Sequence, residues 1–229
     1  MGTPRADTEE QAREVIERLR EEYPDATISL AFSTRLELLV AVVLSAQCTD
    51  ERVNDVTADL FEKYRTAEDY ADAGEDELAD DIGSITYPNQ KAGWIREACR
   101  RIAEEHGGEV PDSMDALTDL PGVGRKTANV VLQHGHDTVE GVVVDTHVMR
   151  LARRLGLVEA EARDAIESEL MELLPESEWQ AFTHLLISHG RAVCTARNPD
   201  CEACVLEGVC PSSRLDSDVD LASGERWEA

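Results

Sequence analysis

A lysine directly behind a glycine turn could supply a nucleophilic amine. The stretch LPGVGRKTANVV, residues 120–131, places Lys126 after Gly122 and Gly124 and beside Arg125. A lysine near the positive end of a helix, next to another cation, should have a lowered pKa and so more of the neutral, nucleophilic amine. Attack by that amine on C1′ of a nucleotide would displace the base, leave an imine and allow β-elimination to break the strand. A solvated surface lysine is the alternative, but arginine fills most basic positions here, since the chain has only three lysines.

That chemistry also needs a carboxylate, and VVVDTHVMR, residues 142–150, supplies Asp145 after an apolar run. Its role would be to stabilise the cationic sugar as the base leaves and to help take the proton of the lysine. Asp145 also stands where the N-cap of the next helix belongs, so a plain capping role is the alternative. The six histidines show no metal-like pattern, and His147 is the one we would test because it lies beside Asp145.

Four cysteines with the spacing C-x6-C-x2-C-x5-C could wrap one metal centre. They are Cys194, Cys201, Cys204 and Cys210. Small zinc sites usually pair two short CxxC knuckles, whereas this run has one CxxC between two wider gaps, so the spacing favours a [4Fe–4S] cluster over zinc. Cys48 and Cys99 stand in apolar helical contexts and are expected in the core.

The glycine turn should join two helices. Asp112 or Ser113 can cap a short helix before it, and RKTANVVLQH restarts a helix after it. Gly122 and Gly124 permit positive φ and carry no side chain, so their backbone N–H groups could face an anion at the positive end of the second helix. This helix–hairpin–helix pattern predicts a contact with DNA phosphate that positions a duplex without reading its sequence.

The wider sequence predicts an all-α fold, because apolar residues recur at helical spacing along most of the chain. A capping box at Thr8, another at Thr34 and a cap at Asp50 mark three helix starts. The helix after Thr34 is apolar on all sides and should be buried. The one strand-like stretch, residues 141–145, is too short to imply a sheet, and the acidic stretch after Pro211 is expected to be loosely ordered.

The charge balance is strongly acidic, with 48 acidic and 22 basic residues and a formal net charge of −26. This composition suggests adaptation to a very salty cytoplasm, where at 1 M salt a Debye length of about 3 Å screens self-repulsion. Cationic partners are the alternative, and the charge taken alone argues against nucleic acid.

The chain opens on polar residues with no signal peptide, and its longest apolar run, residues 38–44, is far shorter than the roughly 20 residues of a membrane span. We therefore expect a cytoplasmic protein without a membrane partner. In that reducing compartment a disulfide framework is not expected for a chain with six cysteines, and metal ligation is the better default.

Four motifs, in order, resemble the endonuclease III family of DNA glycosylases. They are LSAQCTD, LPGVGRKTANVVL, VVVDTHVMR and the HGRAVC run that opens the cysteine cluster. The resemblance spans roughly residues 8–211 and implies base excision repair: removal of oxidised pyrimidines through a lysine Schiff base, followed by β-elimination. It assigns the nucleophile to Lys126, the catalytic carboxylate to Asp145 and a [4Fe–4S] cluster to the four cysteines.

The resemblance also implies a two-lobed fold. A six-helix body over residues 26–138 would hold the hairpin, and residues 1–25 with 139–211 would form the cluster lobe, followed by an acidic tail over residues 212–229. Double-stranded DNA with a damaged base or an abasic site would bind in the cleft between the lobes, with the damaged base flipped out. We expect a monomer.

The predicted DNA contacts come from several loops. By the resemblance, Gln47 fills the space left by the flipped base, and the wedge facing the orphan base falls on Tyr87. At this point the family usually has Gly-Leu/Phe-Tyr before an Asn or Arg, whereas this chain has TYPN at residues 86–89. The loop between the first two cluster cysteines has a single basic residue, Arg197, fewer than the family usually has. The full set is Gln47, Tyr87, Gly122, Gly124, Arg125, Arg150, Arg191 and Arg197.

Acidic charge is spread unevenly along the chain. Residues 51–80 hold eleven acidic and three basic residues, whereas residues 119–154 hold four acidic and five basic residues. We therefore expect a locally neutral-to-positive DNA face on an acidic body, with binding that depends less on counterion release than on backbone donors.

Two other readings stay open. An adenine mismatch glycosylase of the same superfamily would share the cluster and the hairpin, but it usually lacks the lysine and has a further C-terminal domain. A non-catalytic DNA-binding protein with an iron–sulfur cluster would need neither Lys126 nor Asp145.

Overall fold

The computed structural model describes residues 4–215 of the 229-residue chain, and this part of the chain is all-α, with helices and no strand. It forms two compact units, one over Ile28–Glu140 and one that combines residues 4–27 with residues 141–215. Among these residues, no helix combines the length and the apolar character needed to cross a bilayer.

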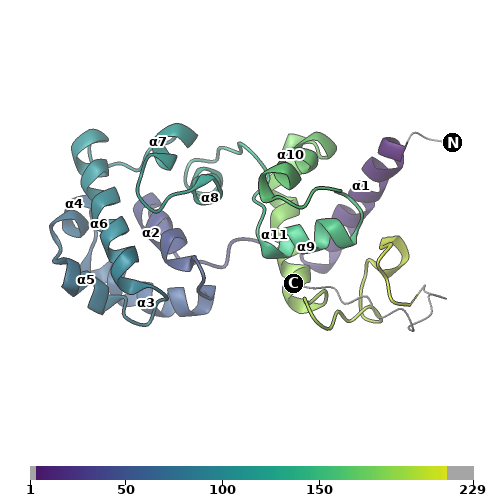
Figure 1. Ribbon diagram of the computed structural model, residues 1–229, viewed down its shortest axis with the longest axis horizontal. Helices are drawn as coiled ribbons and strands as arrows, with labels where there is room; N and C mark the ends of the chain where they lie inside the picture. The colour runs from purple at the N-terminus through teal and green to yellow at the C-terminus, as the bar shows by residue number, and fades with distance from the viewer. Residues whose placement is uncertain (1–3, 216–229) are drawn as a thin grey trace. The chain divides into compact units, whose positions relative to one another are not determined.

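The unit over Ile28–Glu140 is built from seven helices around an aliphatic core (Figure 1). They are α2 (Arg35–Ser45), α3 (Asp50–Lys63), α4 (Ala67–Asp72), α5 (Glu75–Asp81), α6 (Pro88–Glu105), α7 (Met114–Thr118) and α8 (Arg125–Gly135). Helix α2 is buried without interruption from Leu38 to Leu44 and packs on α3, α6 and α8, which confirms that its all-round apolar sequence predicts a central helix.

The structure has seven helices in this unit, whereas the resemblance implies a six-helix body. The acidic stretch between α3 and α6 divides into two short helices because Ala73 leaves helical geometry and Gly74 begins the next helix as its N-cap. Both short helices pack against α6, the longest helix of this unit (Figure 1).

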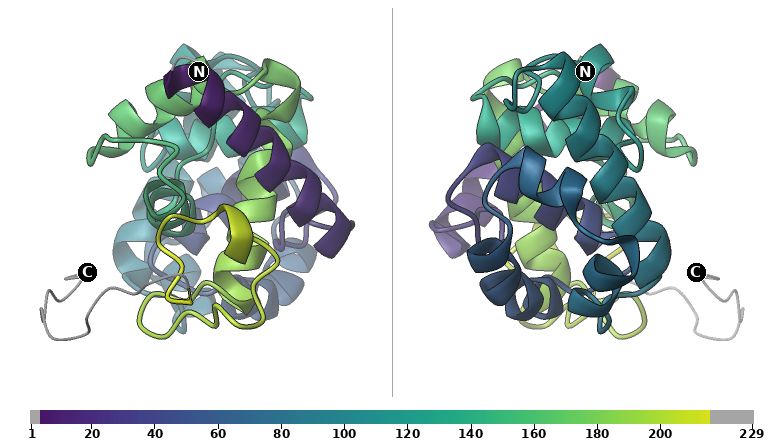
Figure 2. Two further views of the ribbon diagram at one scale, coloured as in Figure 1. Left: turned by 90° about the vertical axis from the view of Figure 1, so that its right-hand side faces the viewer. Right: turned by 90° about the vertical axis from the view of Figure 1, so that its left-hand side faces the viewer.

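The other unit places the first helix of the chain against the last ones. It contains α1 (Pro4–Glu22), α9 (Thr146–Arg154), α10 (Arg163–Leu173), the 3-10 turn η1 (Glu176–Glu178), α11 (Trp179–Ala192) and the 3-10 turn η2 (Glu207–Val209). Helix α1 contacts α10, α11 and η2, and the loop that follows α11 closes beside it (Figure 2). A second apolar core, separate from that of the first unit, fills this one.

The helix caps test three expectations. Thr34 caps α2 by accepting a hydrogen bond from the Glu37 amide, as the sequence predicts. The cap of α3 is Thr49 rather than Asp50, because the Thr49 hydroxyl reaches the Arg52 amide and Asp50 is already helical.

The capping box expected at Thr8 is wrong. Helix α1 already begins at Pro4, so Thr8 lies inside it. The polar partner expected in that box, Gln11, instead donates from Nε2 to the backbone carbonyls of Leu155 and Val209, each at 2.8 Å. Gln11 therefore ties the first helix to the cysteine loop.

The strand-like stretch at residues 141–145 is an extended segment without a partner strand among the described residues. Its residues Val142–Val144 are buried, and the Thr183 hydroxyl on α11 donates to the Val143 carbonyl at 3.3 Å. Of the expected tail, residues 212–215 are described and include the buried Ser213, while residues 216–229 lie outside the described residues.

Candidate functional site

The glycine turn joins α7 to α8 as a helix–hairpin–helix. Ser113 caps α7, as expected, with its hydroxyl accepting from the Ala116 amide at 3.4 Å. Gly122 has φ = +78°, and a Cβ at this position would lie 3.0 Å from the Trp94 side chain on α6. Both the backbone angle and the close packing therefore require glycine here.

Gly124, unlike Gly122, does not use the positive φ that a glycine permits. Its φ is −92° and its ψ is 173°, an extended conformation open to any residue. A Cβ at Gly124 would meet no atom within 4 Å, and Gly124 has no side chain to cap the helix it precedes. The glycine therefore places no side chain of its own over the start of α8, where the first amides have no partner within the helix.

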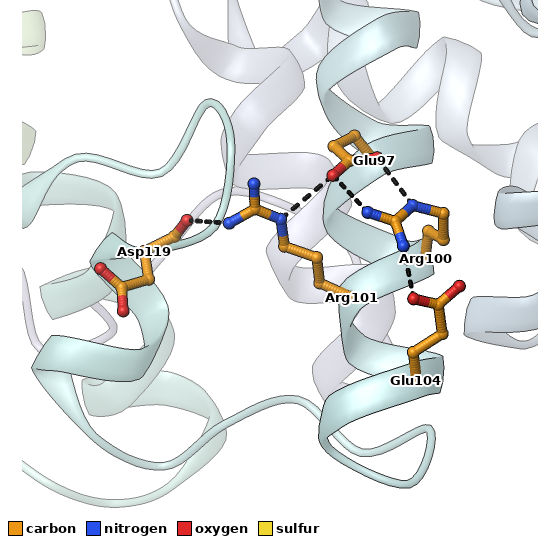
Figure 3. A network of polar contacts seen from close by, with 5 residues as sticks. All are labelled: Glu97, Arg100, Arg101, Glu104 and Asp119. Carbon is orange, nitrogen blue, oxygen red and sulfur yellow. Dashed lines mark hydrogen bonds and ion pairs between the residues drawn. The ribbon is translucent and has the colours of Figure 1, made fainter.

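Helix α6 braces the hairpin with a set of polar contacts (Figure 3). Arg101 donates from Nη1 to the Asp119 carbonyl at 3.1 Å, just before the hairpin, and from Nε to Glu97 at 3.1 Å. Glu97 also forms an ion pair with Arg100, which in turn pairs with Glu104 one turn further along the helix. The residue before the hairpin is thus hydrogen-bonded to the long helix α6, in addition to the contacts between α7 and α8.

Lys126 is exposed and lies in the first turn of α8, beside the exposed Arg125. The other two lysines have structural partners. Lys63 pairs with Asp81 at 2.6 Å and with Glu77. Lys91 is only 2% exposed and donates to two backbone carbonyls.

Gln47 and Tyr87, two of the predicted DNA contacts, come together in this unit. Both are exposed, and both have positive φ, 56° and 59° respectively. The Thr86 hydroxyl donates to the Gln47 carbonyl at 3.0 Å, so the turn after α2 and the turn before α6 are directly joined.

Asp145 is the N-cap of α9, as the simpler of its two readings predicts. One carboxylate oxygen, Oδ1, accepts from the amides of His147 and Val148, each at 2.8 Å. The side chain is half-buried, and its charge raises the pKa of His147, although burial outweighs this and lowers that pKa overall. The cap orients the carboxylate and leaves Oδ2 outside both of these bonds.

Two arginines of α9 hold the start of the cysteine loop. Arg150 donates from Nη2 to the carbonyls of Gly190 and Cys194, both at 3.0 Å. Arg154 donates to the Cys194 sulfur at 3.2 Å and to the next two carbonyls, Thr195 and Ala196. The helix that Asp145 caps therefore also fixes the first cysteine. Arg150, which the sequence predicts to contact DNA, is half-buried, and its guanidinium makes these hydrogen bonds within the protein.

Gly190 makes the close approach of these side chains to α11 possible. A Cβ at this position would lie 2.8 Å from His147 Nδ1 and 3.0 Å from Arg150 Nη2. The other two predicted basic contacts, Arg191 and Arg197, are exposed on either side of Cys194.

The four clustered cysteines are free, half-buried thiols in the loop that follows α11. Burial raises the pKa of Cys204 to about 11, and repulsion from the other three cysteines adds to this, which is the electrostatic sign of four thiols gathered in one place. Four sulfur donors and no oxygen donors match the preference of iron–sulfur clusters. Among the described residues no three side chains are spaced for a single metal ion, so the fit rests on this sulfur chemistry.

His189 is a site residue that the sequence patterns did not single out. It is 1% exposed on α11, with Nε2 3.3 Å from the Cys204 sulfur and Nδ1 3.1 Å from the Tyr23 hydroxyl. Burial lowers the pKa of His189 to about 4, so the imidazole is neutral and one nitrogen can donate to sulfur. The sequence does contain one indication that His189 is buried, because it falls on the same apolar face of α11 as Phe182 and Leu186.

Two family descriptions match the chain. Residues 40–176 match the HhH-GPD superfamily base excision DNA repair protein, and residues 194–210, which span the four cysteines, match the iron–sulfur binding domain of endonuclease III.

Individual relatives cover nearly the whole chain. Endonuclease III of Synechocystis sp. is 49% identical over 91% of this chain and 95% of that protein, and endonuclease III of Escherichia coli (strain K12) is 41% identical over 86% and 93%. A trapped endonuclease III–DNA covalent intermediate superposes with a TM-score of 0.86, at 41% identity over 94% of this chain and 99% of that one. A thermostable thymine-DNA glycosylase shares the fold, with a TM-score of 0.79 at 22% identity.

Proposed function

Since this chain belongs to the endonuclease III family, and is thus a DNA glycosylase with AP lyase activity and a [4Fe–4S] cluster, we propose that Lys126 is its nucleophile. The observation that carries the proposal is the exposed position of Lys126 in the first turn of α8, directly behind the open hairpin. There a phosphate bound by the backbone of Gly124 would bring the sugar next to it within reach of the amine.

In the proposed reaction the neutral Nζ of Lys126 attacks C1′, the glycosidic bond breaks, and the base leaves with the bonding electrons and takes up a proton. The nitrogen then loses a proton and the C1′–O4′ bond breaks, with O4′ taking up a proton, so that the opened sugar carries an imine at C1′. The imine acidifies the C2′ proton, whose removal expels the 3′ phosphate by β-elimination and breaks the strand. Water then hydrolyses the imine and restores the amine. Asp145 stabilises the positive charge that develops on the sugar as the base leaves.

We further propose that Cys194, Cys201, Cys204 and Cys210 hold the [4Fe–4S] cluster. When bound, the cluster supplies iron–thiolate bonds that cross-link a loop with little other regular structure. The residues of this chain set its surroundings: Arg154 contacts Cys194 and His189 contacts Cys204.

The proposed substrate is double-stranded DNA with an oxidised pyrimidine or an abasic site, bound by the protein as a monomer. The hairpin glycines and Arg125 would hold the phosphates, and Gln47 and Tyr87 would enter the duplex where the nucleotide leaves it. Arg150, Arg191 and Arg197 remain predicted contacts from the unit that holds the cysteines.

Borohydride trapping on abasic duplex DNA tests the assignment of the nucleophile, since reduction of the imine leaves a covalent protein–DNA adduct. We expect Lys126→Ala to form no adduct and Asp145→Asn to form it roughly 100-fold more slowly. Lys63→Ala is the matched control, because it removes an exposed lysine whose partners are Glu77 and Asp81, and it should trap like the parent. A Lys126→Ala variant that still cleaves abasic duplexes at the parental rate would refute the proposal.

A further inference from the structure

The turns that carry Gln47 and Tyr87 are conformationally unusual. Positive φ is uncommon for residues other than glycine and is an outlier for a bulky side chain. Tyr87 also precedes Pro88, a position that normally favours extended backbone. Tyr87 is nevertheless 58% exposed, so its own burial does not hold it in this conformation.

A ring of contacts joins the two turns. The Gln47 carbonyl accepts from the Thr86 hydroxyl at 3.0 Å, and the Tyr87 carbonyl accepts from the Lys91 amide at 3.1 Å. The Lys91 ammonium closes the ring by donating to the Ala46 carbonyl at 2.6 Å, one residue before Gln47.

Lys91 thus contributes two of the bonds in this ring, and its side chain is almost fully buried, at 2% exposure. Its ammonium also donates to the Leu44 carbonyl at 2.8 Å, so it binds the last carbonyls of α2, where the helix dipole favours a cation. Burial lowers the pKa of Lys91. No carboxylate is among its hydrogen-bond partners in the described structure, which sets it apart from the ion-paired Lys63.

A buried cation is an expensive way to end a helix, since a glycine or an exposed lysine would satisfy the same carbonyls at less cost. What a buried ammonium adds is a pair of hydrogen bonds, to the Leu44 and Ala46 carbonyls, that fixes α6 to the end of α2. We infer that Lys91 is a positioning residue that holds the two left-handed turns, and with them Gln47 and Tyr87, in the arrangement that enters the duplex. This inference rests on the proposed function of those two side chains.

Comparison of duplex and single-stranded abasic DNA tests the inference. In a duplex the nucleotide must leave the stack and its place must be filled, whereas an unpaired abasic strand needs neither step. We expect Lys91→Met to lower the single-turnover cleavage rate on the abasic duplex roughly 10- to 100-fold, and the rate on the same strand unpaired by less than about threefold. Lys63→Met, which removes the same charge from an exposed position, should change neither rate.

Fluorescence gives a readout independent of cleavage. A 2-aminopurine placed beside the abasic site should brighten when the parent or Lys63→Met unstacks the duplex, and should brighten less with Lys91→Met at saturating protein. Lys91→Gln replaces the ammonium by an uncharged amide N–H donor on a side chain one bond shorter, and we expect it to recover part of both signals.

Three results would overturn the inference. The first two are equal losses on duplex and single strand, which indicate general damage to the site, and no loss on either. If Lys91→Met and Lys91→Gln both fail to fold while Lys63→Met folds, Lys91 serves the fold alone and the inference is also wrong. The proposed function fails separately, when the parent forms no borohydride adduct on either DNA.

Discussion

At the scale of single residues, Asp145 combines two roles that one substitution can separate. Its Oδ1 caps α9 by accepting from two amides, while the carboxylate charge would serve the sugar cation. Asparagine is about as good an N-cap as aspartate, but it has no charge.

We therefore expect the free energy of unfolding of Asp145→Asn to lie within a few tenths of a kcal/mol of the parental value, although the variant loses most of its activity. Asp145→Ala should lose the activity and also about 1 kcal/mol of stability. Urea unfolding followed by circular dichroism measures the stability, and borohydride trapping measures the activity. If the asparagine variant is as destabilised as the alanine variant, the cap does not contribute as the geometry suggests.

At the scale of elements, the two hairpin glycines make different contributions, which the spacing GxG could not reveal. Gly122 needs its positive φ and faces Trp94, whereas Gly124 has ordinary backbone angles and open space. Gly122 is required by the fold of the turn, and under the proposed function Gly124 would serve the contact with DNA.

We expect Gly122→Ala to lower the free energy of unfolding by about 1–3 kcal/mol, because alanine is strained at this φ and its Cβ collides with Trp94. Gly124→Ala should cost less than about 0.5 kcal/mol of stability but weaken the binding of abasic duplex, because its methyl group covers the open start of α8. Unfolding curves and fluorescence anisotropy with labelled duplex measure the two effects. Equal stability losses for the two variants would contradict this division.

A second prediction for an element concerns α9 and the cysteine loop. Arg154→Met removes hydrogen bonds to the Cys194 sulfur and to the carbonyls of Thr195 and Ala196, so the loop should release iron faster. The neighbouring Arg153 pairs only at the surface with Glu161 among the contacts described, and Arg153→Met is the matched control.

The decay of the brown visible absorbance in the presence of an iron chelator measures iron release. We expect it to accelerate several-fold for Arg154→Met, in line with the roughly 10-fold effects of outer-sphere ligands on metal sites. Equal decay in the two variants would show that the arginine is not needed to hold the loop.

The sequence predicts elements better than it predicts connections. Helix periodicity correctly gave the all-α class and the buried α2, and local capping chemistry gave Thr34 and Ser113. The missed features are long-range: Gln11 bonds to residues more than 140 positions away, and Lys91 and His189 sit within apolar stripes, where polar partners are set by tertiary packing. Roles such as these depend on which backbone groups the fold leaves unsatisfied, and that information is not local.

At the scale of the whole molecule, a net charge of −26 opposes folding by self-repulsion in dilute buffer. The exposed face of α3 shows the pattern, with Asp55, Asp59 and Glu62 spaced one turn apart. Like charges at this spacing destabilise a helix by a few tenths of a kcal/mol per pair.

We therefore expect the Tm to rise steeply between about 0.1 and 2 M KCl, since the Debye length falls to about 3 Å at 1 M. The triple variant Asp55→Asn, Asp59→Asn, Glu62→Gln should start from a higher Tm at low salt and gain less as KCl is added. Differential scanning calorimetry measures both. A parental Tm that stays flat or falls over this range would remove the argument that the acidic surface is an adaptation to salt.

The discontinuous unit also has a consequence for synthesis on the ribosome. Helix α1 is synthesised well before the rest of its unit, because its apolar stripe of Ala12, Val15, Ile16 and Leu19 packs in a core completed by residues 142–206. The contiguous unit over Ile28–Glu140 can fold once it has left the exit tunnel, whereas α1 can pack only after residues 142–206 have been synthesised. During that delay the apolar stripe of α1 is exposed on the nascent chain. This is the interval in which binding by a chaperone would most increase the fraction of chains that fold.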